Sequence, residues 1–282
     1  MRGRFDNFVK VVKSYRCYDK IKVFVRILHF KNIVPYIYTM PALYGLIGYP
    51  LSHSFSPAYF KKKFAEQAID AVYELFPIEH INEFPELLEK NPGIRGLNVT
   101  TPHKVTVISY LDELDSIAAE IGAVNCIVIK DGIKKGYNTD AIGFEQSLNP
   151  LLQPQHTQAL VLGTGGSSRA VAYALTQLGI PFQKVSRHEA KGVLTYEKLT
   201  ADIIAQHKLI INTTQLGMYP LIDAAPLIPY DGISEHHLLY DLIYNPEESK
   251  FLSLGRERGA AIKNGFEMLL LQAEACWRIW NQ

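Results

Sequence analysis

From residue 43 onward, short apolar runs alternate with amphipathic stretches, and this alternation restricts the possible fold more than any other feature. The strand-like runs include LYGLIG at 43–48, AVYELF at 71–76, IRGLNV at 94–99 and QALVLG at 158–163. Helical patterns separate them, and the last one extends from about Phe266 to Trp280. Strands that alternate with helices form parallel sheets with helices on both faces. We therefore predict an α/β protein built on parallel sheets.

The composition is that of an ordinary soluble globular protein. The chain has 282 residues, of which 48% are hydrophobic and 20% charged, and its formal net charge is +1. This length allows two domains. The net charge gives no reason to expect a nucleic acid or a membrane surface as a partner. No apolar run approaches the roughly 18–20 residues of a membrane span.

The three cysteines, Cys17, Cys126 and Cys276, are few and far apart in the sequence. They form no CxxC motif and no cluster with histidine at the spacing of metal ligands. Such usage is typical of a reducing compartment. It predicts a cytoplasmic location and no structural metal.

The first 39 residues differ from the rest of the chain in charge. They contain nine Lys/Arg residues against Asp6 and Asp19, a net charge of +7. Such a segment could be a targeting signal, a basic arm for a polyanion, or sequence upstream of the true start. It lacks the apolar core and small-residue cleavage site of a secretory signal. We favour a dispensable extension, 1–39, and expect a chain that begins at Met40 to fold and retain full activity.

A glycine-rich turn, GTGG at 163–166, follows the strand predicted at 158–163. Gly163 permits the tight turn, and Gly165 allows the backbone to approach a pyrophosphate, whose oxygens the amides of the following helix would bind. Ser168 stands at the third fingerprint position, where it is small enough for close packing. A turn of this kind can also be no more than a tight connection between a strand and a helix.

The next strand ends in Ser186-Arg187, where NAD-binding enzymes usually carry a carboxylate for the ribose 2′-hydroxyl. The first carboxylate here is Glu189. An arginine at this place suits the 2′-phosphate of NADP, because a guanidinium forms strong charge-assisted hydrogen bonds with phosphate. The alternative is a solvated arginine at the end of a strand.

Two motifs upstream of the glycine turn place a lysine and an aspartate near the nucleotide site. They are NVTTPHK at 98–104 and NTD at 138–140. Thr101-Pro102 is typical of a helix start, so Lys104 would lie in a first turn, where the helix dipole helps an amine to release its proton. Such a lysine could act as general acid and base, with Asp140 to orient it. Alternatively, the two residues are an exposed helix-start lysine and a helix cap.

At this point the chain from 42 to 282 resembles the shikimate dehydrogenases. Several motifs carry the resemblance, in the same order as in that family. They are GYPLSHSFSP (48–57), GLNVTTPHK (96–104), IGAVN (121–125), GYNTDAIGF (136–144), GTGGSSRA (163–170), INTTQLGM (211–218), YDLIYNP (240–246) and NGFEMLLLQA (264–273).

The resemblance implies a role for each matching position. Lys104 would be the general acid and base at the C3 oxygen of the substrate, and Asp140 would share that hydroxyl. The residues expected to bind the substrate carboxylate and ring hydroxyls are Ser54, Ser56, Asn98, Thr100, Asn125, Tyr244 and Gln272. Those expected to bind NADP are Gly163, Gly165, Gly166, Ser186, Arg187, Leu242 and Gly265. Singly, these residues could be turn, cap or surface residues.

The implied reaction is the reversible NADPH-dependent reduction of 3-dehydroshikimate to shikimate, in the biosynthesis of chorismate and the aromatic amino acids. It needs no metal, because the lysine supplies the proton and the cofactor the hydride. The expected partners are therefore a small-molecule substrate and NADP, with no nucleic acid or membrane, in a monomer or homodimer. Two alternatives remain: a quinate/shikimate dehydrogenase with relaxed substrate or NAD use, and a catalytically silent paralogue that binds the nucleotide.

The implied architecture has two α/β domains. An N-terminal substrate domain would span 40–139, and a Rossmann-like NADP-binding domain would span 140–264. The final helix, 265–282, would return to the substrate domain, because Gln272 must reach the same cleft as Ser54. Three departures from the family pattern are Cys126 in place of threonine, VSRHEAK in the cofactor strand, and Ser249; none alters the Lys104–Asp140 pair.

Overall fold

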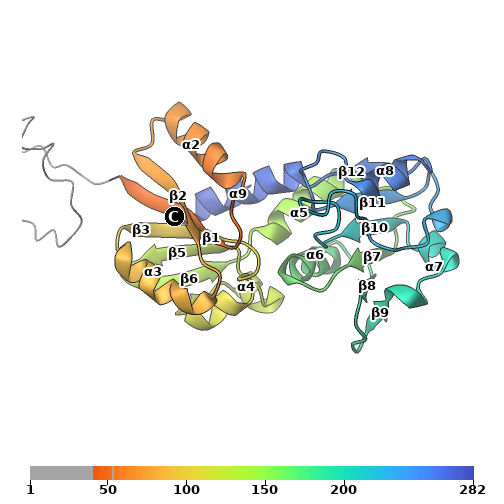
Figure 1. Cartoon of the computed structure of the whole chain (residues 1–282), viewed down its shortest axis with the longest axis horizontal. Coiled ribbons are helices and arrows are strands. Elements are labelled where there is room, and N and C mark those ends of the chain that lie inside the picture. The colour runs from red at the N-terminus through yellow and green to blue at the C-terminus, as the bar shows by residue number, and fades with distance from the viewer. Residues whose placement is uncertain (1–40, 53) are drawn as a thin grey trace, which may run out of the picture. The chain divides into compact units, whose positions relative to one another are not determined.

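The computed structural model describes residues 41–52 and 54–282. The predicted extension, 1–39, lies outside the described residues. The chain from Pro41 to Gln282 forms one compact unit that contains two six-stranded sheets, each with its own helices. Figure 1 labels these elements.

The first sheet is mixed and has the strand order β2-β1-β3-β5-β6-β4. Its strands are β1 (Ala42–Gly48), β2 (Ala71–Pro77), β3 (Ile94–Val99), β4 (Glu113–Leu114), β5 (Cys126–Lys130) and β6 (Ile133–Tyr137). Helices α2 (Ser56–Glu66), α3 (Phe84–Lys90) and α4 (Ser116–Ile121) and the 3₁₀ turns η2 (Ile81–Glu83) and η3 (Thr106–Tyr110) connect them.

The prediction of parallel sheets is wrong for part of this sheet. β5 pairs antiparallel with both β3 and β6. Only Asp131 and Gly132 separate β5 from β6, and both have positive φ, 53° and 81°. A two-residue Asp-Gly loop with positive φ at both positions is the typical link of an antiparallel hairpin, so no crossover to a parallel strand is possible there.

The second sheet is parallel throughout, with the order β12-β11-β10-β7-β8-β9. Its strands are β7 (Ala159–Leu162), β8 (Phe182–Ser186), β9 (Val193–Thr195), β10 (Leu209–Asn212), β11 (Leu238–Asp241) and β12 (Ala261–Lys263). The accompanying helices are α5 (Asp140–Leu148), α6 (Gly166–Gln177), α7 (Ala201–Gln206), α8 (Lys250–Arg256) and α9 (Phe266–Trp280), with 3₁₀ turns η4 (Asn149–Leu151), η5 (Tyr196–Lys198) and η6 (Tyr230–Gly232).

This strand order is that of a doubly wound dinucleotide-binding sheet, in which ligands bind where the order reverses. The reversal falls between β7 and β10. Every residue of β7 is fully buried, as expected for a central strand covered on both faces. The glycine-rich turn follows β7, so the sheet places it at the reversal point. The α/β prediction is confirmed.

The last helix, α9, spans Phe266–Trp280 as the sequence pattern predicts, and its C-terminal half packs on the first sheet (Figure 1). Trp280 Nε1 donates to Ile127 O at 2.9 Å. The indole lies so close to Gly96 that a side chain there would collide with it. A second link is a disulfide between Cys126 and Cys276, which the inference of a reducing compartment did not anticipate.

None of the helices in residues 41–52 and 54–282 has the length and apolar character needed to cross a membrane.

Candidate active site

The segment that carries Lys104 does not form the helix predicted from Thr101-Pro102. Residues 101–105 form turns, the Thr101–Pro102 peptide bond is cis, and the first helical residues belong to η3. Tertiary hydrogen bonds hold the segment instead. The ring of His103 lies 2.8 Å from Ile78 O, and Val124 N donates to Lys104 O at 2.7 Å. Lys104 therefore does not lie in the first turn of a helix, and its role depends on its side-chain contacts.

Lys104 and Asp140 form a largely buried ion pair. Lys104 Nζ donates to Asp140 Oδ2 at 2.6 Å, and the side chains are only 15% and 6% exposed. Asp140 is the first residue of α5, but Thr139 occupies the cap position and neither side chain caps the helix. The carboxylate is therefore directed to the lysine, so the alternative of a helix-capping aspartate is wrong.

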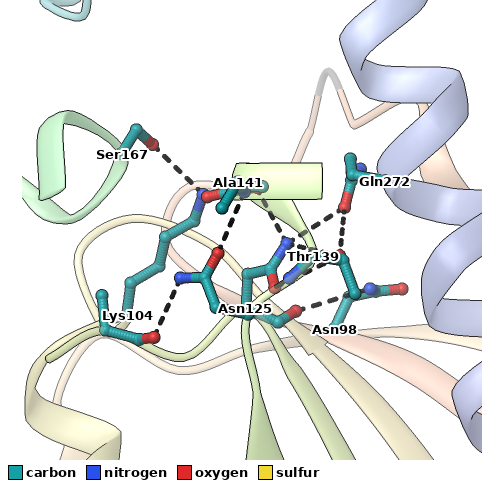
Figure 2. Close-up of polar contacts among 10 residues, drawn as sticks. Asn98, Lys104, Asn125, Thr139, Ala141, Ser167 and Gln272 are labelled. Atoms are coloured by element: carbon teal, nitrogen blue, oxygen red, sulfur yellow. Dashed lines mark hydrogen bonds and ion pairs between the residues drawn. The ribbon is translucent and has the colours of Figure 1, made fainter. Parts of the chain in front are cut away.

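Asn125 connects the Asp140 carboxylate to a network of amides and hydroxyls, in which Figure 2 shows Asn125, Thr139 and Gln272. Asn125 Nδ2 donates to Asp140 Oδ1 at 2.8 Å, to Thr139 Oγ1 at 2.9 Å and to Gln272 Oε1 at 3.1 Å. Asn125 Oδ1 accepts from Thr139 N at 2.7 Å. Asn125 follows α4 and Gln272 lies in α9, so residues distant in the sequence meet at the side chain of Asn125.

Asn98 lies beside this network, at the end of β3. Its Oδ1 accepts from the hydroxyl of Tyr73 at 2.8 Å, and its Nδ2 donates to Cys276 Sγ at 3.2 Å and to Asn125 O at 3.5 Å. Burial raises the pKa of Tyr73, which keeps this hydroxyl a donor. A weaker influence that lowers this pKa comes from the side chain of Ser56, the first residue of α2.

Three other predicted substrate residues contact different parts of the chain. Ser54 N donates to Leu51 O, and Thr100 N donates to Ile47 O at 2.9 Å. The Tyr244 ring lies 6.2 Å from that of Phe55, between Ser54 and Ser56. Burial raises the pKa of Tyr244, opposed by a hydrogen bond to the backbone of Phe55. These contacts link the Ser54–Ser56 loop to Tyr244, but no hydrogen bond joins Ser54, Thr100 or Tyr244 to Lys104 or Asp140 among the described contacts.

The three glycines of the turn after β7 have different surroundings. Gly163 has φ of +116°, and a side chain there would meet the Thr213 hydroxyl, so both conformation and space require glycine. A Cβ on Gly165 would meet nothing within 4 Å, whereas one on Gly166 would lie 3.0 Å from Lys104 Cβ. The buried Ser168 donates to Gly163 O at 2.7 Å and closes the turn.

Ser186 is the last residue of β8 and lines a cavity of about 670 Å³, and Arg187 is the next residue in the chain. Thr164 of the glycine turn and Ser186 line this cavity, with the basic residues Arg169 and Lys184, the imidazole of His188, and the acidic residues Glu120 and Glu189. Burial lowers the pKa of Lys184, and the positive charge of Arg169 lowers it further by a smaller amount. Arg187 is exposed, and Glu189 is paired with Lys198 at 2.6 Å.

Leu242 and Gly265 are neighbours. Gly265 N donates to Ile243 O at 3.0 Å, and a side chain on Gly265 would collide with Leu242 O. The preceding residue, Asp241, is fully buried, and burial raises its pKa to about 6. Its carboxylate accepts from Ser249 Oγ, from Asn212 Nδ2 at 3.0 Å and from Ile243 N at 3.0 Å.

The backbone amides at the start of α6 and the open space beside Gly165 fit the pyrophosphate of a dinucleotide. The amides at the start of α6 face the turn where Gly165 leaves room, which matches how helix N-termini bind phosphates.

The sequence comparisons agree with this geometry. A family model described as the shikimate dehydrogenase substrate binding domain matches residues 46–127. The enzyme named shikimate dehydrogenase (NADP(+)) of Bacillus cereus (strain ATCC 10987 / NRS 248) is 38% identical over 260 residues, covering 86% of this chain and 93% of its own. The chain belongs to the shikimate dehydrogenase family.

Solved structures of two dehydrogenases share the fold. Shikimate 5-dehydrogenase of Thermus thermophilus, solved with NADP(H) and shikimate, is 29% identical, with a TM-score of 0.76 over 84% of this chain and 92% of its own. Quinate dehydrogenase from Corynebacterium glutamicum, solved with NAD, is 26% identical, with a TM-score of 0.74 over 85% and 93%. The fold alone therefore does not determine substrate or cofactor within the family.

Sequence reasoning missed several residues of the site. Thr139 was visible inside the NTD motif, because a hydroxyl next to the aspartate could be expected to contact the same groups. Ser167, which accepts from Lys104 Nζ at 3.2 Å, was visible as the residue after GTGG. Tyr73 carried no signal, because it is one of several aromatic residues in an apolar strand.

Proposed function

We propose that the chain is an NADP-dependent shikimate dehydrogenase, which reversibly reduces 3-dehydroshikimate to shikimate in chorismate biosynthesis. The observation that carries this proposal is the buried Lys104–Asp140 pair, at 2.6 Å, within a ring of neutral amides and hydroxyls and against the glycine turn. A lysine held in this way can carry a proton, and neutral groups are suited to reading a polyhydroxylated acid.

Lys104 is the general acid in the direction of reduction. Its amine donates a proton to the C3 carbonyl oxygen of the substrate as that oxygen becomes a hydroxyl, and it takes the proton back in the reverse direction. Asp140 orients the amine and accepts a hydrogen bond from the same hydroxyl. The low exposure of both side chains excludes water from the proton path.

The substrate is held by the neutral residues around this pair. Asn125, Gln272 and Asn98 exchange hydrogen bonds with one another or with neighbouring groups in this structure. A substrate can replace several of these bonds without leaving a buried polar group unpaired. Ser54, Ser56, Thr100 and Tyr244 complete the proposed substrate set. An analogue that lacks a hydroxyl would leave its partner unsatisfied and would be rejected.

NADP would be held by three parts of the second sheet. Gly163, Gly165 and Gly166 would receive the pyrophosphate at the start of α6, Ser186 and Arg187 the 2′-phosphate, and Leu242 and Gly265 would lie beside the nicotinamide. When bound, the reduced cofactor supplies the hydride. The exposed Arg187 at this position supports NADP over NAD, because its guanidinium can form charge-assisted hydrogen bonds with the 2′-phosphate.

Two alternatives make different predictions. A quinate/shikimate dehydrogenase with relaxed specificity would also use quinate or NAD. A silent nucleotide-binding paralogue would turn over none of these substrates. Such a protein would have no need of the Lys104–Asp140 pair, so the presence of this pair argues against it.

The domain limits 40–139, 140–264 and 265–282 belong to our proposal, as do a cytoplasmic location and a monomeric or homodimeric state. Light scattering on the purified protein measures its mass in solution and therefore its oligomeric state.

One assay separates these functions. Initial rates are measured from the absorbance of the reduced nicotinamide, with shikimate or quinate and with NADP or NAD in all four combinations. We expect the highest kcat/KM for shikimate with NADP. A higher kcat/KM for quinate or for NAD would favour the relaxed enzyme, and no turnover in any combination would favour the silent paralogue.

A further inference from the structure

The amine of Lys104 has a second side-chain partner besides Asp140. Lys104 Nζ donates to Ser167 Oγ at 3.2 Å (Figure 2). Ser167 is the second residue of α6, the helix that begins in the glycine turn. The two partners therefore hold the amine from different elements: Asp140 from the start of α5 and Ser167 from the start of α6.

The stem of the lysine side chain also packs against the start of α6. A Cβ on Gly166 would lie 3.0 Å from Lys104 Cβ and 3.5 Å from its Cδ. The side chain is only 15% exposed. A lysine side chain has four rotatable bonds, and holding it in one conformation has a large entropic cost. Contacts along the stem and at both sides of the amine fix where the nitrogen lies.

Resting on the function proposed above, we propose that Ser167 is a positioning residue for the proton carrier Lys104. Its hydroxyl restrains the amine on the side of the cofactor turn, while Asp140 restrains it on the side of the substrate network. With Asp140 alone, the amine would keep its ion pair but could swing about that single contact. Proton transfer depends closely on geometry, so this freedom would lower the rate of the chemical step.

Ser167→Ala removes only the hydroxyl oxygen and keeps the Cβ, so the packing at the start of α6 loses no carbon atom. We expect kcat to fall about 3- to 10-fold, the effect of losing one hydrogen bond of typical net strength. The KM for shikimate and the Kd for NADP, measured by thermal shift, should stay within about twofold. The unfolding midpoint should not decrease. Ser167→Thr keeps the hydroxyl and should restore kcat.

Two further measurements distinguish positioning from an unrelated loss of activity. In the Lys104→Ala background, Ser167→Ala should have no further effect on kcat, because the partner that it positions is absent. The Lys104 amine should also react about threefold faster with an amine-selective reagent in the Ser167→Ala protein, as mapped by peptide mass spectrometry. Ser253→Ala, which removes an exposed hydroxyl of α8, is the matched control and should change neither quantity.

Unchanged kcat and unchanged labelling in Ser167→Ala would overturn the proposal, as would an equal loss of kcat with and without Lys104. The labelling measurement does not depend on turnover. If the wild-type protein were inactive, the proposed function would fail, but the labelling rates would still decide whether Ser167 restrains the lysine.

Discussion

Lys104 Nζ lies 2.6 Å from Asp140 Oδ2, and each residue is fixed by a different part of the fold. Tertiary hydrogen bonds of His103 and of the Lys104 carbonyl hold the turn after β3, whereas Asp140 begins α5. Burying two charges carries a desolvation cost that their attraction often fails to recover, so such a pair is weak evidence for stability. A function that requires a lysine beside a carboxylate explains the pair better.

The first prediction concerns Asp140→Asn. The substituted amide could still accept from Lys104, but its NH₂ group would then face the Asn125 NH₂ group, which now donates to Asp140 Oδ1. Two donors in contact would turn Asn125 away from its place. We expect steady-state kinetics to show a lower kcat, by roughly 10- to 100-fold, together with a higher KM for shikimate.

The control is Asp112→Asn, which alters an exposed carboxylate that also accepts from a lysine, Lys134, at 2.7 Å. It should leave both constants unchanged. An Asp140→Asn protein with the KM of wild type would show that Asp140 does not contact the substrate.

The second prediction concerns cofactor choice. Arg187→Ala should weaken NADP binding by about one to two orders of magnitude and barely affect NAD, because a charge-assisted contact with phosphate contributes roughly 1.5–3 kcal/mol. Titration of each cofactor gives the two dissociation constants. Arg256→Ala removes an exposed arginine paired with Glu248 and should change neither. Equal losses for both cofactors would contradict the assignment of Arg187 to the 2′-phosphate.

The third prediction concerns the stability contributed by Asp241. Burial raises its pKa to about 6, so the folded state binds the proton more tightly than the unfolded state. This contribution is fully present below the unfolded pKa, near 4, and is lost as the pH rises through about 6. The unfolding free energy of wild type relative to Asp241→Asn should therefore increase by about 1 kcal/mol between about pH 7 and about pH 5, out of about 3 kcal/mol in full.

Urea unfolding at each pH measures this difference, in which the other titrating groups cancel. A difference between wild type and Asp241→Asn that does not vary with pH would mean that the Asp241 carboxylate is charged throughout this range.

The fourth prediction concerns the Cys126–Cys276 disulfide, which closes a loop of 150 residues. Breaking a cross-link over a long loop typically costs about 2–5 kcal/mol. We expect a reductant to lower the unfolding midpoint of the wild-type protein and to leave that of Cys126→Ala/Cys276→Ala unchanged. The denatured protein should show one reactive thiol before reduction and three after it. Three reactive thiols before reduction would mean that the two sulfurs are not bonded.

The parts of the fold that the sequence predicted well are those in which local pattern and tertiary structure agree. Helix α9 follows an amphipathic pattern between a glycine and the chain end, and its bounds match the prediction. The parallel second sheet was predicted because its strands alternate with helices along the chain.

The failures are places where distant contacts or a single turn decided the structure. Residues 101–105 have the pattern of a helix start, but hydrogen bonds to Ile78 and Val124 hold them in turns. The antiparallel β5–β6 pair depends on two residues, Asp131 and Gly132. The cysteine pair could not be predicted, because a sequence separation of 150 residues says nothing about spatial distance. The family motifs indicated residues for the site, but they did not reveal Tyr73.

The most direct test of the account is kcat of Lys104→Ala with shikimate and NADP. If Lys104 carries the proton, kcat should fall by roughly 10²- to 10⁴-fold, the usual contribution of a positioned general acid and base. The KM for shikimate should change much less, because most of the proposed binding groups are neutral and lie elsewhere. Lys134→Ala, which removes a lysine paired with an exposed carboxylate, should retain the wild-type kcat. A Lys104→Ala enzyme with near-native kcat would contradict the account, because the proton would then travel by a route that does not include this lysine.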